Sequence, residues 1–342
     1  MPDSGRPSDF SVSSVGSVGH KNAPMTLPAS DHFNGKTFFN PGGPAERGLR
    51  DVLRWQLTSR RARWPKWVEI VPQPAPPAPV DDAVTATWVN HSTFLLQTAG
   101  HSVLTDPAFS ERASPFTWAG PRRAHAPGVA FSDLPRIETV LLSHDHYDHC
   151  DAPSLRRLAR EHQPLFIAPL GHRALLAELG ATRIVELDWW QAHSPARGLT
   201  VTLTPAKHWS RRTVGGTNRR LWGGFCLQTP GRRVWFAGDS GYDETLFRSI
   251  RQHCGAPDLA LIPIGAYEPR WFMSAAHMNP AEAVRTHVDC GARQSVAMHW
   301  GTFQLTDEAW EAPARALEVA RAEAGLAEDD FRLLQPGQSV TV

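Results

Sequence analysis

Short apolar runs separated by polar turns recur along the chain from residue 84 onward. Most of these runs are too short for a core helix and are rich in Val, Ile, Leu, Phe and Trp, which favours buried strands. We therefore expect strands at 84–89, 93–98, 102–105, 139–142, 165–168, 199–204, 224–228, 234–237, 259–264, 295–298 and 339–342.

Helical periodicity appears between several of these strands. Apolar residues there recur at three- and four-residue spacing, which is typical of a helix with one buried face. Asp151 and Pro153 supply an N-cap and an early proline, and together they favour a helix start. We expect helices at 45–63, 152–161, 172–179, 244–253, 280–288 and 307–324.

The order of these elements predicts an α/β fold. Strands first follow one another directly and then alternate with helices, a pattern that two face-to-face sheets with helices outside would satisfy. Residues 1–30 are poor in apolar residues and are expected to be disordered or loosely draped. Residues 31–80 should form a helical arm ending in a stiff Pro-rich linker, and residues 81–342 the catalytic domain.

The arm carries Trp55, Leu57, Trp64 and Trp67 beside several arginines. One interpretation is an amphipathic segment that contacts a membrane surface. The other is that the arm packs on the main domain with its tryptophans in the core. The sequence alone leaves both interpretations open.

Charge and cysteine content exclude several classes of function. The formal net charge of +1 predicts no extended basic surface, which argues against a nuclease or another nucleic-acid partner. The four cysteines form no Cys-x-x-Cys pair, so a thiolate zinc site is not expected. No window reaches the length of a membrane span and no secretory core is visible, which favours a cytoplasmic protein. A peripheral location at the inner membrane face is compatible with this prediction.

The most informative stretch is His144-x-His146-x-Asp148-His149, directly after the strand predicted at 139–142. Imidazole and carboxylate groups suit zinc and similar divalent metals. A solvated, histidine-rich turn is the alternative, but the complete pattern favours a metal site. Because so short a loop cannot surround one ion tetrahedrally, we expect His144 and His146 to hold one metal and Asp148 and His149 a second.

Three further candidates each follow an apolar strand. His208 comes after 199–204, and Asp239 and His299 follow two later strands. Each residue alone is more typical of a hydrogen-bonded structural role. Together they lie at carboxyl ends of strands, where α/β sheets gather their sites.

These motifs, in this order, resemble the metallo-β-lactamase superfamily. The resemblance implies a four-layer αββα sandwich with a dinuclear site at one sheet edge. It assigns His144, His146 and His208 to one metal and Asp148, His149 and His299 to the other, with Asp239 bridging them.

Segments outside the metal motifs resemble the N-acyl-phosphatidylethanolamine-hydrolysing phospholipase D family. The segments are 88–93, 104–107, 112–115, 186–190, 262–273 and 299–303. The resemblance implies that His277 contacts the substrate phosphate, although Ala276 stands where vertebrate members carry glutamine. It also suggests a homodimer.

Other residues are assigned supporting roles. We expect His91 and Asp106, both at strand ends, to hydrogen-bond the ligands, although either could merely stabilise its own turn. Tyr147 and His277 are predicted to bind substrate. The catalytic residues are predicted to be Asp148, Asp239 and His277.

The predicted activity is that of a metal-dependent phosphodiesterase of phospholipase D type. It would cleave N-acyl-phosphatidylethanolamine to N-acylethanolamine and phosphatidic acid through a hydroxide held by two Zn²⁺ ions, although iron and manganese suit the same ligands. One alternative is a hydrolase of the same fold acting on a lactone or a cyclic phosphodiester. The other is a non-catalytic binding protein with a relic site, against which the intact seven-residue set argues.

Overall fold

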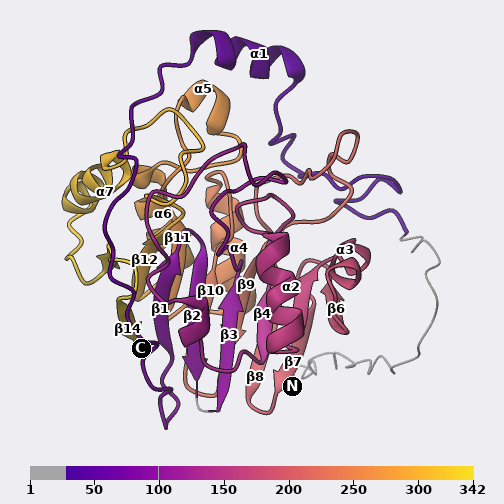
Figure 1. The fold of residues 1–342 in the computed structure, drawn as a ribbon, viewed down its shortest axis with the longest axis vertical. Coiled ribbons are helices and arrows are strands. Elements are labelled where there is room, and N and C mark those ends of the chain that lie inside the picture. The colour runs from indigo at the N-terminus through magenta and orange to yellow at the C-terminus, as the bar shows by residue number, and fades with distance from the viewer. Residues whose placement is uncertain (1–27, 99) are drawn as a thin grey trace, which may run out of the picture.

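The computed structural model describes residues 28–98 and 100–342. In these residues the strands form two seven-stranded sheets (Figure 1). The first sheet has the order β14-β1-β2-β3-β4-β5-β6, antiparallel from β14 to β3 and parallel from β3 to β6. Its strands are β1 (Thr85–Asn90), β2 (Thr93–Thr98), β3 (His101–Thr105), β4 (Thr139–Leu141), β5 (Leu165–Pro169), β6 (Arg183–Leu187) and β14 (Ser339–Thr341).

The second sheet has the order β13-β12-β11-β10-β9-β8-β7. It is parallel from β13 to β10 and antiparallel from β10 to β7. Its strands are β7 (Ala192–Ala196), β8 (Leu199–Thr204), β9 (Gly224–Gln228), β10 (Arg233–Phe236), β11 (Leu259–Pro263), β12 (Gln294–Met298) and β13 (Phe331–Arg332).

Helices cover the outer face of each sheet. α2 (Ala152–Glu161) and α3 (Arg173–Glu178) pack on the first sheet, and α4 (Glu244–Cys254), α6 (Pro280–Cys290) and α7 (Ala312–Glu323) on the second (Figure 1). The remaining helices are α1 (Leu49–Thr58), the 3₁₀ turn Phe131–Asp133 and α5 (Arg270–Met273). The layers are therefore helix, sheet, sheet and helix, and the predicted αββα sandwich is confirmed. None of the helices in the described part of the chain combines the length and apolarity needed to cross a bilayer.

Strand alternation distributes the core between the layers. In β2, Phe94 and Leu96 face the core between the two sheets, whereas Leu95 faces α2 and α3. Val103 and Leu104 of β3 divide in the same way, because successive side chains point to opposite faces of a sheet. The first sheet is covered on one face by the second sheet and on the other by helices, which explains why its strands appear as continuous apolar runs.

Several predicted elements differ from the structure. The helix expected at 45–63 spans only Leu49–Thr58. Gly48, a residue of low helix propensity, is extended with ψ 164°, and the chain leaves the helix at Ser59, where ψ is 135°. The helix expected at 307–324 begins only at Ala312. The strands β6, β7 and β13 and the short helix α5 were not predicted. These three strands lie at sheet edges and are short or partly exposed, so no strong apolar pattern marks them.

The arm contacts the main domain along its length. The Trp55 ring stacks on Phe272 at 4.9 Å, and the Trp64 indole N–H donates to the Glu308 carbonyl at 2.9 Å. No α1 side chain is fully buried, and Trp67 is 42% exposed. The tryptophans thus rest on the domain surface rather than in its core. The domain boundaries stay a prediction, and the segment predicted to be disordered lies, apart from residues 28–30, outside the described residues.

Candidate metal centre

Four loops bring the predicted ligands together at one end of the sandwich. The loop between β4 and α2 supplies the histidine-rich motif, and single residues follow β8, β10 and β12. The seven residues that the structure brings together are His144, His146, Asp148, His149, His208, Asp239 and His299.

Three imidazole nitrogens converge on the side of the site nearest β8. His146 Nδ1 lies 2.9 Å from His144 Nε2 and 3.2 Å from His208 Nε2. His208 Nδ1 lies 3.1 Å from the Ala276 carbonyl, to which only an N–H can donate, so a neutral His208 presents a bare Nε2 to the site. Together the three nitrogens form a set that one cation can bind.

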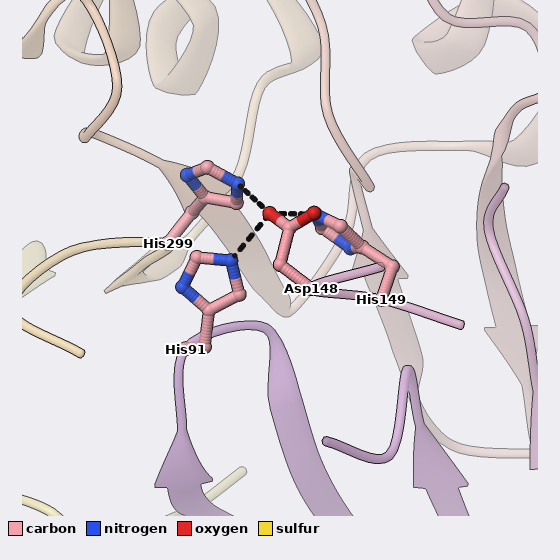
Figure 2. A group of neighbouring side chains, drawn as sticks. All are labelled: His91, Asp148, His149 and His299. Atoms are coloured by element: carbon pink, nitrogen blue, oxygen red, sulfur yellow. Dashed lines mark hydrogen bonds and ion pairs between the residues drawn. The ribbon is translucent and has the colours of Figure 1, made fainter. Parts of the chain in front are cut away.

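A second group forms around two carboxylates. His149 Nε2 and His299 Nε2 lie 3.3 Å and 3.4 Å from Asp148 Oδ2, and both lie 3.1 Å from Asp239 Oδ2. Figure 2 shows the Asp148 carboxylate facing His149, His299 and also His91. This second set combines two imidazoles with carboxylate oxygens.

Asp239 lies between the two groups. Its Oδ2 is 3.1 Å from the two imidazoles of the second group and 3.9 Å from His144 Nε2 and from His208 Nε2 in the first. The side chain is 2% exposed, so its charge requires a partner inside the protein. This is the position that a carboxylate shared by two cations would occupy.

The electrostatics of the site favour a bound cation. Burial alone would raise the pKa of the Asp239 carboxyl, but His149 and His299 outweigh it and hold that pKa well below its usual value. Burial would lower the pKa of His299, but Asp239 and Asp148 raise it to about 9. Burial lowers the pKa of His144 well below its usual value, so this imidazole is neutral. The site therefore combines buried carboxylates, which need a positive charge beside them, with a neutral imidazole that can bind a cation.

The donor set fits a divalent metal. His149 Nε2, His299 Nε2 and Asp239 Oδ1 are buried, and within the described residues no hydrogen bond of acceptable geometry satisfies them. Buried polar atoms without a partner are rare unless something else binds them. Imidazole and carboxylate donors suit zinc, iron and manganese.

Sequence comparison places this site in a known family. The family model described as the beta-lactamase superfamily domain matches residues 101–300. The chain belongs to the metallo-β-lactamase superfamily.

Two similar proteins and one solved structure extend this result. The chain is 36% identical over 269 residues to N-acyl-phosphatidylethanolamine-hydrolyzing phospholipase D 1 of Caenorhabditis elegans, covering 75% of this chain and 76% of the relative. It is 35% identical to the mitochondrial N-acyl-phosphatidylethanolamine-hydrolyzing phospholipase D of Saccharomyces cerevisiae, covering 68% of this chain and 51% of that one. Igni18, a metallo hydrolase from the archaeon Ignicoccus hospitalis, has a TM-score of 0.58 at 22% identity, covering 76% of this chain and 98% of Igni18, and thus shares the fold.

As in other metallo-hydrolases, outer hydrogen bonds can orient the ligands of such a site. Asp106 Oδ2 accepts from His149 Nδ1 at 2.7 Å and from the Ser143 hydroxyl at 2.5 Å. The same hydroxyl lies 2.9 Å from His144 Nδ1, so its proton goes to Asp106 and it accepts from the imidazole. Ser143 therefore links the two groups of candidate ligands. Ser143 was not predicted from the sequence, where its place directly before the motif was the only signal.

His91 is the other predicted supporting residue, and it contacts a candidate ligand. Its Nε2 lies 3.0 Å from Asp148 Oδ2. Burial lowers the pKa of His91 to about 3, so the neutral ring donates an N–H to the carboxylate. The contact turns Asp148 toward His149 and His299 (Figure 2).

The two predicted substrate-binding residues are placed differently. His277 lies beside the site, with its Nδ1 3.9 Å from Asp239 Oδ2 and only 15% of its side chain exposed. The Tyr147 hydroxyl instead donates to the Arg212 carbonyl at 2.7 Å. Its role in binding substrate stays a prediction.

Three residues around the site have left-handed backbone. His91, Asp106 and His299 adopt φ values of 45°, 32° and 60°, in the left-handed region that non-glycine residues rarely enter. At Gly238, directly before Asp239, φ is 64° and an added Cβ would lie 2.7 Å from the Gly223 carbonyl oxygen. Strained residues persist where the surrounding structure fixes them, and they cluster at functional sites.

Proposed function

We propose that this protein is a phospholipase D-type phosphodiesterase that cleaves N-acyl-phosphatidylethanolamine to N-acylethanolamine and phosphatidic acid. The coarser activity, metal-dependent hydrolysis, follows from the family and the site. The named activity of the two relatives supports the choice of substrate.

One observation carries the proposal. Asp239 Oδ2 lies within 4 Å of imidazole nitrogens from both groups, which makes a single site of two ligand sets. We propose that His144, His146 and His208 hold one Zn²⁺ and Asp148, His149 and His299 the other, with Asp239 shared. Iron and manganese suit the same ligands.

Two divalent ions, when bound, would lower the pKa of a water and offset negative charge developing at phosphorus. In the reaction, a water oxygen forms a bond to phosphorus, and the bond from phosphorus to the ethanolamine oxygen breaks. One water proton ends on that leaving oxygen, which gives the N-acylethanolamine, and phosphatidic acid is the other product. The side chains of Asp148 and Asp239 would hold the metal-binding groups in position for this displacement.

His277 is proposed to orient the phosphodiester. Its Nδ1 is buried and has no hydrogen-bond partner within the described residues, although it points to the same carboxylate as the candidate ligands. An N–H from this ring can donate to a phosphate oxygen placed above the site. The carbonyl of Ala276, the residue before His277, accepts a hydrogen bond from His208. The proposed phosphate contact His277 and the candidate metal ligand His208 are therefore connected through one backbone turn.

A lipid substrate also requires access from a membrane, and α1 offers a surface for it. Leu49, Leu53 and Leu57 recur at four-residue spacing and are 74%, 49% and 86% exposed. Residues 46–66 contain seven basic side chains and two acidic ones. Figure 1 shows α1 lying over α5 at one end of the molecule. We propose that this leucine face enters an anionic lipid surface, with the protein on the cytoplasmic side.

Flotation with anionic phosphatidylglycerol vesicles tests this surface. The triple variant Leu49→Ser, Leu53→Ser, Leu57→Ser should lose about ten-fold or more in vesicle partitioning, because three exposed apolar side chains leave the interface. Val288→Ser, on α6 and 57% exposed, is the matched control. Equal flotation of the triple variant and the wild type would remove α1 as a membrane contact.

A substrate panel tests the activity itself. The metal-loaded protein is incubated with N-acyl-phosphatidylethanolamine, a lactone and a cyclic phosphodiester, and products are identified by mass spectrometry. We expect phosphatidic acid and N-acylethanolamine from the first, and a rate that a chelator abolishes. Hydrolysis of only the lactone or the cyclic phosphodiester would overturn the proposed substrate and retain the hydrolase.

A further inference from the structure

The segment between His208 and β9 folds back over the histidine-rich motif. Within it, Arg212 Nη1 donates to the Asp145 carbonyl at 3.1 Å and to the Cys150 carbonyl at 2.8 Å. Asp145 lies between the candidate ligands His144 and His146, and Cys150 directly follows the last ligand of the motif. One guanidinium therefore spans the motif loop from near its start to its end.

A second arginine from the same segment holds the loop through a side chain. Arg220 Nη1 lies 2.8 Å from Asp145 Oδ2. The Asp145 side chain is fully buried, whereas that of Arg220 is 24% exposed. Removing one partner of such a pair leaves an uncompensated buried charge, which is strongly unfavourable. The residue between the two motif histidines is therefore tied to the segment that begins with His208.

Arg212 and Tyr147 also contact each other directly, through two interactions. The Arg212 guanidinium lies 4.3 Å from the centre of the Tyr147 ring, and the Tyr147 hydroxyl donates to the Arg212 carbonyl at 2.7 Å. Arg212 is half-buried by these contacts, whereas the neighbouring Arg211 is exposed. The two arginines of this pair thus differ in their environment, and Arg212 Nη1 is engaged by the loop carbonyls.

We propose that Arg212 and Arg220 are positioning residues that hold the motif loop against the segment carrying His208. This pair of arginines, here called the clamp, brings His144, His146 and His208 together before a cation binds. Arginine suits position 212 because its Nη1 carries two N–H groups, one for each carbonyl, while the planar guanidinium lies over the Tyr147 ring. The inference rests on the metal site of the proposed function and not on the substrate.

The test measures zinc affinity and amide exchange in the full-length protein. Arg212→Ala and Arg220→Met should each weaken zinc binding about 10- to 100-fold in chelator competition, the range typical of lost outer contacts to metal ligands. In the zinc-free protein, the amides of His149 and Cys150, which donate to the His146 carbonyl, should exchange faster. Arg220→Lys should restore most of the affinity, since the ion pair to Asp145 can form again.

Arg219→Ala is the matched control, because Arg219 is exposed and adjoins Arg220. Unchanged zinc affinity in both Arg212→Ala and Arg220→Met would overturn the clamp. Weaker affinity without faster exchange would also overturn it, because the arginines would then not act by holding the loop. If Arg212→Ala does not fold, the Arg220→Met and Arg220→Lys pair decides. A wild-type protein that binds no zinc would instead refute the proposed function, and the exchange rates would still judge the clamp.

Discussion

Asp239 presents one buried carboxylate oxygen to four imidazoles of the candidate ligand set, which come from three loops. Without a charged group at this point, the two sets of candidate ligands would not form one site. We expect Asp239→Asn to lower metal content below two equivalents per chain and to reduce kcat/KM by more than the 10- to 100-fold typical of outer-shell partners. Elemental analysis together with the phospholipid assay checks both effects.

Asp329→Asn is the control for that substitution, since its side chain is 75% exposed and lies outside the site. It should leave metal content and rate unchanged. An Asp239→Asn variant with full metal content and full rate would remove Asp239 from the site.

Asp106 acts on the site only through other side chains. Its carboxylate holds His149 at 2.7 Å and the Ser143 hydroxyl at 2.5 Å. Asp106→Asn should weaken metal binding about 10- to 100-fold, while excess metal still fills the site, because the ligands themselves remain. A chelator titration measures the change, and an unaltered dissociation constant would mean that Asp106 only stabilises its turn.

At the scale of residues, the sequence predicted which residues form the candidate site better than it predicted the contacts between them. The spacing of the motif and the strand-end positions of His208, Asp239 and His299 led to a set of residues that the structure brings together. The contacts of Ser143 and Arg212 could not be predicted in this way, because they depend on how separate loops fold onto one another. Left-handed backbone at His91 and His299 is likewise invisible in residue type.

At the scale of elements, the loop after β11 shows how the second sheet supports its site. Glu308 accepts the backbone N–H groups of Ala266 at 2.6 Å, Tyr267 at 3.3 Å and Glu268 at 3.1 Å. Gly265 in the same loop packs so closely on His299 that an added Cβ would lie 2.0 Å from its carbonyl oxygen. The buried carboxylate thus fixes a loop that borders a candidate ligand.

Replacing Glu308 by Ala should lower the free energy of unfolding by about 3 kcal/mol, because three partly buried N–H groups lose their acceptor. Glu308→Gln keeps one acceptor oxygen and should lose about half as much. Urea denaturation measures both, with the exposed Glu318→Ala on α7 as a control within about 0.5 kcal/mol of wild type. Equal stability of the three variants would show that the loop does not depend on Glu308.

Elements with two buried faces were predictable, whereas β6, β7 and β13, three of the four edge strands of the described sheets, were not. β11 and β12 lie inside the second sheet and are almost wholly buried, so their composition identifies them. β7 is half-exposed and contains a proline, which obscures its pattern. The apolar face of α1 did predict a helix. Its residues Leu49, Leu53 and Leu57 face away from the core, however, and the helix is shorter than expected.

At the scale of the whole molecule, the two sheets and the arm converge on one end of the sandwich. Ligand loops come from both sheets, since the motif follows β4 of the first, and His208, Asp239 and His299 follow strands of the second. A bound cation would therefore cross-link the two halves of the fold. The homodimer suggested by the resemblance stays a prediction, which light scattering of the purified protein would test.

Metal removal should consequently destabilise the entire sandwich. A ligand present at about 1,000 times its dissociation constant adds about 4 kcal/mol to the stability of the state that binds it. We expect a chelator to lower the Tm of the wild type clearly and that of Asp239→Asn much less. Calorimetry measures the difference, and identical Tm values with and without chelator would show that no cation joins the sheets.

Anomalous X-ray scattering from crystals of the zinc-loaded protein locates each metal and its ligands. We expect two zinc peaks per chain, one in contact with His144, His146 and His208 and the other with Asp148, His149 and His299. The Asp239 carboxylate should touch both. A single peak, or peaks bound by residues outside this set, would refute the shared two-metal site.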